Sequence, residues 1–156
     1  MSKSLVEIEG FDQLRQQISR LGKDSLKRRE MLKILRQSAK ATVRAAKREA
    51  PVSAAPHLVS GRRTRKVIQP GNLKKSIGNI TGRSKTVPTI YVGARAKRNH
   101  DGWYAHFVHG GTRSGIQPNP FMDRAYNQTK GQVTPDLEQK VARYVQKQIN
   151  KLRNAT

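Results

Sequence analysis

The chain has 156 residues, of which 35% are hydrophobic, and its 32 lysines and arginines against 10 aspartates and glutamates give a net charge of +22. This length fits a single domain, residues 1–156, with a modest core. The absence of cysteine excludes disulfides, thiol catalysis and cysteine-ligated metals. No apolar run approaches the ~20 residues that span a bilayer, and the N-terminus does not resemble a signal peptide. We therefore expect a soluble protein with no membrane partner.

The first fifty residues predict a strand followed by two helices. Leu5–Glu9 is expected to form a short edge strand, and Phe11–Leu21 an amphipathic helix, because its apolar residues recur at helical spacing. A longer helix is expected over residues 25–50, ending before a proline. One of its sectors is an apolar stripe, made of Leu32, Leu35, Ala39, Val43, Ala46 and Ala50. Another sector is small or mildly apolar, made of Met31, Ile34, Ser38, Thr42 and Ala45. The helix is therefore expected to pack on two sides.

A third sector of the long helix is basic, about a quarter turn from the apolar stripe. We call it the basic ridge; it consists of Arg29, Lys33, Arg36, Lys40, Arg44 and Lys47. A solvated face and a binding face are both compatible with it. A face that serves solubility alone usually mixes charges, and the ridge contains no acid.

Pro51 to Gly71 predicts a loop, since it has three prolines and neither helical nor strand periodicity. Loops of this length in compact domains are usually functional or disordered until bound. The basic cluster in this loop (Arg62, Arg63, Arg65 and Lys66) is expected to contact a partner. No acidic residue occurs between Glu49 and Asp101. Such a surface suits a polyanion, such as packaged double-stranded DNA, or an acidic protein surface.

Three strands of a small antiparallel sheet are expected next, at Ser76–Thr81, Thr89–Arg95 and Trp103–His109. The third is inferred from alternating faces and from the glycine pair that follows it, since glycine supplies the positive φ angles of a sharp turn. The last element is a helix over 120–153. Asn119 is its expected N-cap, and Gly131 and Pro135 predict a break or kink near residue 134. The fold class is therefore α+β: two N-terminal helices, a small antiparallel β-sheet and a C-terminal helix.

Catalysis is not expected. His106 and His109 would lie on opposite faces of the third strand, which makes them poor joint metal ligands, and His100 has no complete ligand set beside it. A two-metal nuclease needs several clustered carboxylates, and this chain has few near its basic segment. A metal-independent ribonuclease that uses the histidines, or a small ribosome-dependent toxin, stays open but has no supporting motif. We expect no enzyme, no metal and no cofactor.

The segment Tyr104–Ala125 carries a more specific pattern: YA-x-apolar-V-x-x-GT, a short loop, then PF-apolar-x-x-A. This pattern resembles the tail-completion, or head–tail joining, family of long-tailed (siphovirus-type) bacteriophages. The matching residues are Tyr104, Ala105, Phe107, Val108, Gly111, Thr112, Pro120, Phe121, Met122 and Ala125. The family usually has a carboxylate where this chain has His109. The resemblance extends over about residues 5–128 but is specific only in this segment.

The resemblance implies a structural virion protein made in the host cytoplasm. It would form a ring, expected to be a homohexamer, in the neck between the portal or adaptor and the tail-terminator or tail-tube proteins, bordering the DNA channel. The matched residues would fix a sheet-to-helix junction, and about residues 52–70 would be a basic insertion. Tail-terminator and adaptor roles stay open. The alternative is a sequence-independent nucleic-acid-binding protein, which the charge favours, although aromatic residues make up only 5% of the chain.

Overall fold

The computed structural model describes residues 25–60, 65–96 and 99–154, so the predicted strand Leu5–Glu9 and helix Phe11–Leu21 lie outside the described residues. In chain order its elements are α2 (Ser25–Ser38), α3 (Lys40–Glu49), β1 (His57–Ser60), β2 (Arg65–Ile68), α4 (Asn72–Ser76), β3 (Ile77–Thr81), β4 (Ile90–Ala94), α5 (Ala105–Gly110) and α6 (Phe121–Arg153). The α+β fold class is confirmed. Within the described residues, no helix combines the length and apolar character of a membrane span.

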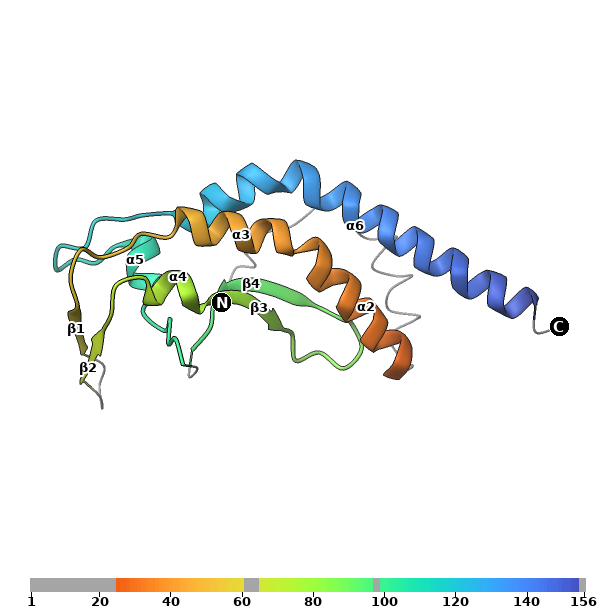
Figure 1. Ribbon diagram of the computed structural model, residues 1–156, viewed down its shortest axis with the longest axis horizontal. Helices are drawn as coiled ribbons and strands as arrows, with labels where there is room; N and C mark the ends of the chain where they lie inside the picture. Colours follow the sequence, from red (N-terminus) through yellow and green to blue (C-terminus); the bar gives the residue numbers. More distant parts are fainter. Residues whose placement is uncertain (1–24, 61–64, 97–98, 155–156) are drawn as a thin grey trace.

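The elements stack in three layers (Figure 1). The long helix α6 lies on one side of α2 and α3, and the β3–β4 ribbon lies on the other. The β1–β2 hairpin projects from the end of the molecule where α4 and α5 lie, and α6 extends past α2 at the opposite end. The two ends of the molecule are therefore built from different elements.

The long helix predicted over residues 25–50 is realised as α2 and α3, which meet at Ala39. The hydrogen-bond ladder continues across this point, because the Ala39 N–H donates to Leu35 O (3.0 Å) and the Val43 N–H donates to Ala39 O (3.0 Å). Its two packed sides are confirmed. Ala46 lies in the core shared with the sheet, and the Thr42 hydroxyl is hydrogen-bonded to the Thr129 hydroxyl on α6 (2.9 Å).

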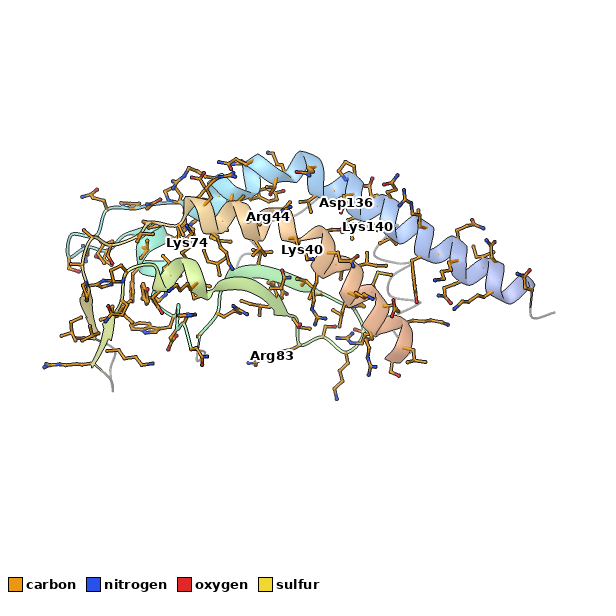
Figure 2. The ribbon with its side chains drawn as sticks, in the orientation of Figure 1. Lys40, Arg44, Lys74, Arg83, Asp136 and Lys140 are labelled. Carbon is orange, nitrogen blue, oxygen red and sulfur yellow. The ribbon has the colours of Figure 1, made fainter. Side chains whose placement is uncertain are left out.

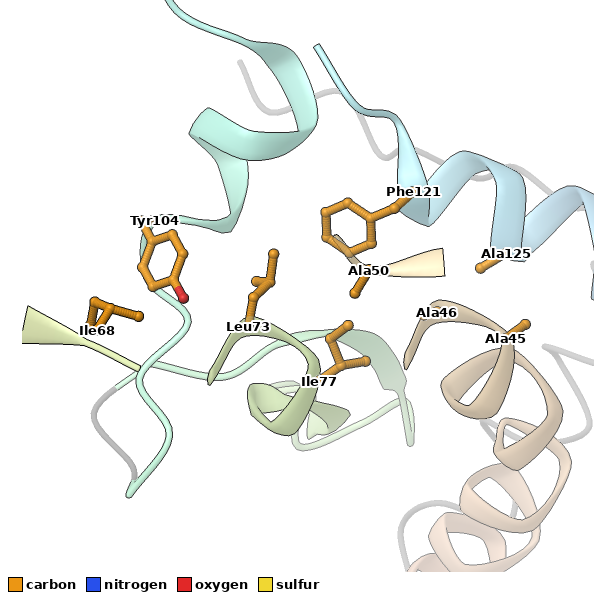
Figure 3. Packing of buried hydrophobic residues seen from close by; sticks show 9 residues of the cluster. All are labelled: Ala45, Ala46, Ala50, Ile68, Leu73, Ile77, Tyr104, Phe121 and Ala125. Atoms are coloured by element: carbon orange, nitrogen blue, oxygen red, sulfur yellow. The ribbon is translucent and has the colours of Figure 1, made fainter. Parts of the chain in front are cut away.

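The main core forms where α3, α4, β3 and the start of α6 converge (Figure 3). Phe121 and Ile77 fill its centre and are 1% and 0% exposed. The other buried residues that α3, its C-cap and α6 contribute are alanines, namely Ala45, Ala46, Ala50 and Ala125, while α4 contributes Leu73. Small residues on both helices allow α3 and α6 to approach closely, so that one phenylalanine fills the remaining space. A second cluster joins α2 to the middle of α6 through Met31, Leu137 and Val141.

Both sheets are two-stranded and antiparallel: β1 pairs with β2, and β3 pairs with β4. The first two strands of the predicted sheet are confirmed as β3 and β4, with Ile80 opposite Tyr91. The predicted third strand, Trp103–His109, is wrong, because this segment contains α5. Its residues fit both periods: Tyr104 and Val108 are four residues apart, a spacing that puts them on one face of a strand and also on one face of a helix. Seven residues are too few for periodicity to decide between the two.

The prediction of an irregular loop over Pro51–Gly71 is also wrong. The segment contains the β1–β2 hairpin, in which Leu58 pairs with Val67 and Val59 pairs with Lys66. Each strand has four residues, and both mix polar and apolar side chains on each face. Cross-strand pairing therefore forms the hairpin without a clear alternation in the sequence.

A break or a kink was predicted near residue 134. Helix α6 runs from Phe121 to Arg153 without a break, with Pro135 inside it. Pro135 has no N–H to donate to the preceding turn, and Figure 1 shows α6 changing direction part-way along its length. The Asn119 side chain does not cap the backbone as expected. Its Oδ1 accepts a hydrogen bond from Arg124 Nη2 (2.6 Å), while Pro120 O accepts the Arg124 N–H (3.1 Å).

Glu49 links the end of α3 to α6. Its Oε2 accepts a hydrogen bond from Arg124 Nε (2.8 Å), and its Oε1 accepts one from Gln128 Nε2 (2.9 Å). These two side-chain hydrogen bonds, that from Arg124 first, lower the pKa of Glu49 below its ordinary value of 4.5. A carboxylate whose pKa is lower in the folded state stabilises the fold above the ordinary pKa. That contribution is lost as the pH falls through the folded-state pKa.

We predict that Glu49→Gln lowers the melting temperature at neutral pH, and that the gap to the unsubstituted protein closes in acid, below pH 4.5. Thermal unfolding followed by circular dichroism across this range measures it. Glu138→Gln is the matched control, since Glu138 is an exposed carboxylate on α6 with no ion pair among the described residues. A gap that does not change with pH would contradict the linkage.

Candidate partner-binding surfaces

Tyr104 connects the short helix α4 to the turn before α5. Its ring is 6% exposed, and its hydroxyl accepts a hydrogen bond from Asn72 Nδ2 (3.1 Å), which also donates to Asp101 O (2.8 Å). The edge of the ring meets His57 on β1, with ring centroids 6.3 Å apart. Tyr104 therefore contacts the β1–β2 hairpin, α4 and the turn before α5 at once. The sequence predicted it in a strand, whereas it lies directly before α5.

The other matched residues divide into buried and exposed groups. Phe121 and Ala125 are fully buried and fix the start of α6 on α3. Val108 is half-buried against the same core, and its carbonyl accepts the Asn119 N–H (3.0 Å), which closes the loop between α5 and α6.

Phe107 is 38% exposed and packs edge-on against Trp103, with centroids 6.0 Å apart. Pro120 is exposed.

Gly111 and Thr112 shape the start of that loop. Gly111 has φ 73° and ψ 179°, a combination that only glycine adopts readily. A Cβ at this position would lie 2.7 Å from the carbonyl oxygen of Ile116. Thr112 closes the turn, because its N–H donates to Ile116 O (2.9 Å) and its Oγ1 accepts the Ile116 N–H (3.2 Å).

His109 faces the carboxylate of Asp123, with 3.4 Å between Nε2 and Oδ2. Asp123 lies in the first turn of α6, so this contact joins α5 to the start of α6. Because α5 is a helix, His106 and His109, three residues apart, lie on the same side of it, so the prediction that they lie on opposite faces was wrong. Across residues 25–60, 65–96 and 99–154, no group of three or more potential metal ligands occurs.

A concave surface that the sequence did not predict lies beside β1; we call it the end groove. Its volume is about 600 Å³, and its walls come from four stretches of chain: residues 51–60 with β1, residues 69–73 at the start of α4, residues 103–108 with α5, and the 112–116 loop. Its exposed apolar side chains are Val52 (55%), Leu58 (57%), Phe107 (38%) and Ile116 (49%). Within the described part of the chain, no lysine, arginine, aspartate or glutamate lines it. On a chain of net charge +22, an uncharged apolar hollow is the kind of surface at which protein contacts form.

The basic ridge is exposed along its length. Five of its six residues are exposed and Lys47 is half-buried. Arg36 Nη2 donates to Thr81 Oγ1 (3.0 Å) at the end of β3, a neutral acceptor that leaves the charge of the guanidinium intact. The four ion pairs among the described residues (Lys66–Asp101, His109–Asp123, Arg124–Glu49 and Lys140–Asp136) involve none of the ridge residues. Figure 2 shows Lys40 and Arg44 on α3.

The basic cluster expected in the loop is only partly described. Arg65 lies exposed on β2. Lys66 points to the opposite face of the hairpin and is paired with Asp101, with 3.9 Å between Nζ and Oδ2. Arg62 and Arg63 lie outside the described residues. Arg65 and Lys66 therefore point in opposite directions, and only Arg65 is without an ion pair among the described residues.

Comparisons with protein-family models, with curated proteins and with solved structures find no match.

We predict that Gly111→Ala destabilises the fold by about 1–2 kcal/mol or more, because it combines a positive φ with a clash against the Ile116 carbonyl. Gly110→Ala is the matched control: it is the adjacent glycine, and a Cβ there meets nothing within 4 Å. Chemical denaturation of both variants measures the difference. Equal stability of the two variants would show that the turn does not require glycine at 111.

Proposed function

We propose that this protein is a structural virion protein of the phage neck that acts in tail completion. It would assemble as a ring, expected to be a hexamer, between the portal or adaptor and the tail tube. Its mechanism would be binding, in which subunits pack side by side and present surfaces to the adjoining rings and to the DNA channel. The resemblance of the Tyr104–Ala125 segment to head–tail joining proteins motivates the proposal.

The observation that carries the proposal is the end groove. A strongly basic subunit can pack against a neighbour only where charged groups need not be buried. The end groove offers an apolar contact without that cost, and the strand beside it, β1, is paired only with β2 within the described chain. Unpaired strand edges and apolar hollows are the surfaces that oligomer formation covers.

The groove is better suited to a protein segment than to a small substrate. Two of its polar groups are already engaged: the Asn72 amide donates to the hydroxyl of Tyr104 and to the carbonyl of Asp101. Apart from Gln69, the remaining lining is apolar or hydroxylated, and its one ionisable nitrogen group, His57, packs against the Tyr104 ring. Such a surface provides contact area and no arrangement for proton transfer or nucleophilic attack.

The basic ridge supports a second candidate, a sequence-independent nucleic-acid-binding protein. The ridge cations, which form no ion pair with the residues the structure describes, provide the electrostatic term of such binding. The two candidates differ in where the protein acts: a dedicated binder works as an isolated chain on cellular nucleic acid, whereas a neck protein works within a particle.

The neck role predicts a defined particle defect. A nonsense mutation in this gene should yield separate DNA-filled heads and tails in lysates, since a neck protein is needed only at the joining step. Electron microscopy of the lysates measures this, and addition of the purified protein should restore joining. Intact infectious virions from the mutant would overturn the neck role and leave the nucleic-acid-binding candidate.

Two phenylalanines of the matched segment should act differently. Phe121→Ala should cost about 3–5 kcal/mol of stability, because it empties the centre of the core. Phe107→Ala should cost well below this, since the ring is 38% exposed, yet it should impair head–tail joining because the ring lines the end groove. Denaturation curves and the joining assay measure the two effects. If the Phe107→Ala protein folds and still joins heads to tails normally, the end groove is not an assembly surface.

A further inference from the structure

We infer that the basic ridge of α2 and α3 is a binding surface for the phosphate backbone of duplex DNA. The inference deepens the proposed function, on which it rests for its biological setting, by naming the face that meets the polyanion. The six ridge residues recur every three or four positions over a helix pair whose hydrogen-bond ladder is continuous through Ala39. They therefore form one line of charge on one side of the molecule.

The ridge has the dimensions of a backbone contact. From Arg29 to Lys47 it spans 18 residue steps, or about 27 Å at ~1.5 Å per residue. Duplex DNA of that length contains about eight base pairs and carries one negative charge per ~1.7 Å. A ridge with a cation every ~5–6 Å along its axis can thus meet a phosphate at each residue.

Among the described residues, no ion pair neutralises the charge of the ridge. No ridge residue takes part in the ion pairs of the described chain, and Glu30, the one carboxylate on α2, forms none there either. The α2 end of the ridge continues onto a second basic element. Arg28 Nη1 donates to the carbonyl of Lys85 (3.1 Å), which holds the Lys85 end of the β3–β4 connection against α2.

The composition of the two helices favours duplex over single-stranded nucleic acid. Single-strand binders stack bases on aromatic side chains, and α2 and α3 contain no aromatic residue. The cations project from a rigid helical scaffold rather than from a loop. This arrangement suits contacts to phosphates, which position a protein on DNA without reading its sequence.

The test is the salt dependence of DNA binding by the isolated full-length chain. A fluorescein-labelled duplex of about 20 base pairs, longer than the stretch one ridge covers, is titrated by fluorescence anisotropy between about 50 and 200 mM salt. The ridge variant carries three substitutions together: Lys33→Gln, Lys40→Gln and Arg44→Gln. The matched control is Arg143→Gln, Lys147→Gln, Lys151→Gln on α6. Each triple lowers the net charge from +22 to +19, and glutamine has nearly the helix propensity of lysine and arginine.

We expect the ridge variant to reduce the slope of log K against log salt by about 3, at ~0.9 for each lost phosphate contact. The α6 control should change the slope by less than about 1. Equal losses in both variants, or no loss in the ridge variant, would overturn the inference. A competition experiment gives a further test. If poly-L-glutamate displaces the labelled duplex as effectively as unlabelled DNA of the same total charge, the inference is also overturned, because the ridge would then bind an acidic protein equally well. No particle is involved, so intact virions from the nonsense mutant would refute the neck role without affecting this result.

Discussion

The structure depends on the close contact between α3 and the start of α6. Ala45 and Ala46 of α3 and Ala125 of α6 are at most 3% exposed, and their small side chains let the two helix backbones approach closely. Phe121 then fills the space between α3, α4 and β3. Polar contacts at the rim of the same contact, from Thr42 to Thr129 and from Glu49 to Arg124, fix its register. Since small residues on both helices create this contact, a larger side chain at any of these alanines would force the layers apart.

This contact also determines where the other surfaces lie. With one side of α3 committed to α6 and another to the sheet, the basic ridge is the side left to solvent. The segment from Tyr104 to Phe121 must then pass over α4 to reach the start of α6. The hydrogen bond from the Asn119 N–H to the Val108 carbonyl fixes its path. This path brings α5 and the 112–116 loop opposite β1 and forms the end groove. The charged surface and the uncharged hollow thus both follow from how one helix pair packs.

Sequence reasoning succeeded where one short segment carried the information. The ridge could be predicted because helical spacing fixes which side chains share a face. The predicted sheet-to-helix junction is a contact between helices instead, because Trp103–His109 contains α5, although Phe121 and Ala125 are buried at the start of α6. Sequence reasoning failed where tertiary contacts decided the outcome. Alternation over Trp103–His109 fits a helix as well as a strand, and the β1–β2 strands are formed by pairing across the hairpin, not by strong propensity. The end groove could not be predicted, because its walls come from four separate stretches of chain.

The separation of charged and uncharged surfaces constrains how copies of such a chain could pack together. Subunits of net charge +22 repel one another, and a contact that buried lysine or arginine would add a desolvation cost of several kcal/mol per ion. A contact through the end groove avoids that cost but leaves the long-range repulsion. A polyanion along the ridges would remove the repulsion, and whatever binds the assembled form better than the free subunit stabilises assembly by linkage. In a ring built this way, closure and polyanion binding would favour each other, and the ring would form most readily where DNA is already present.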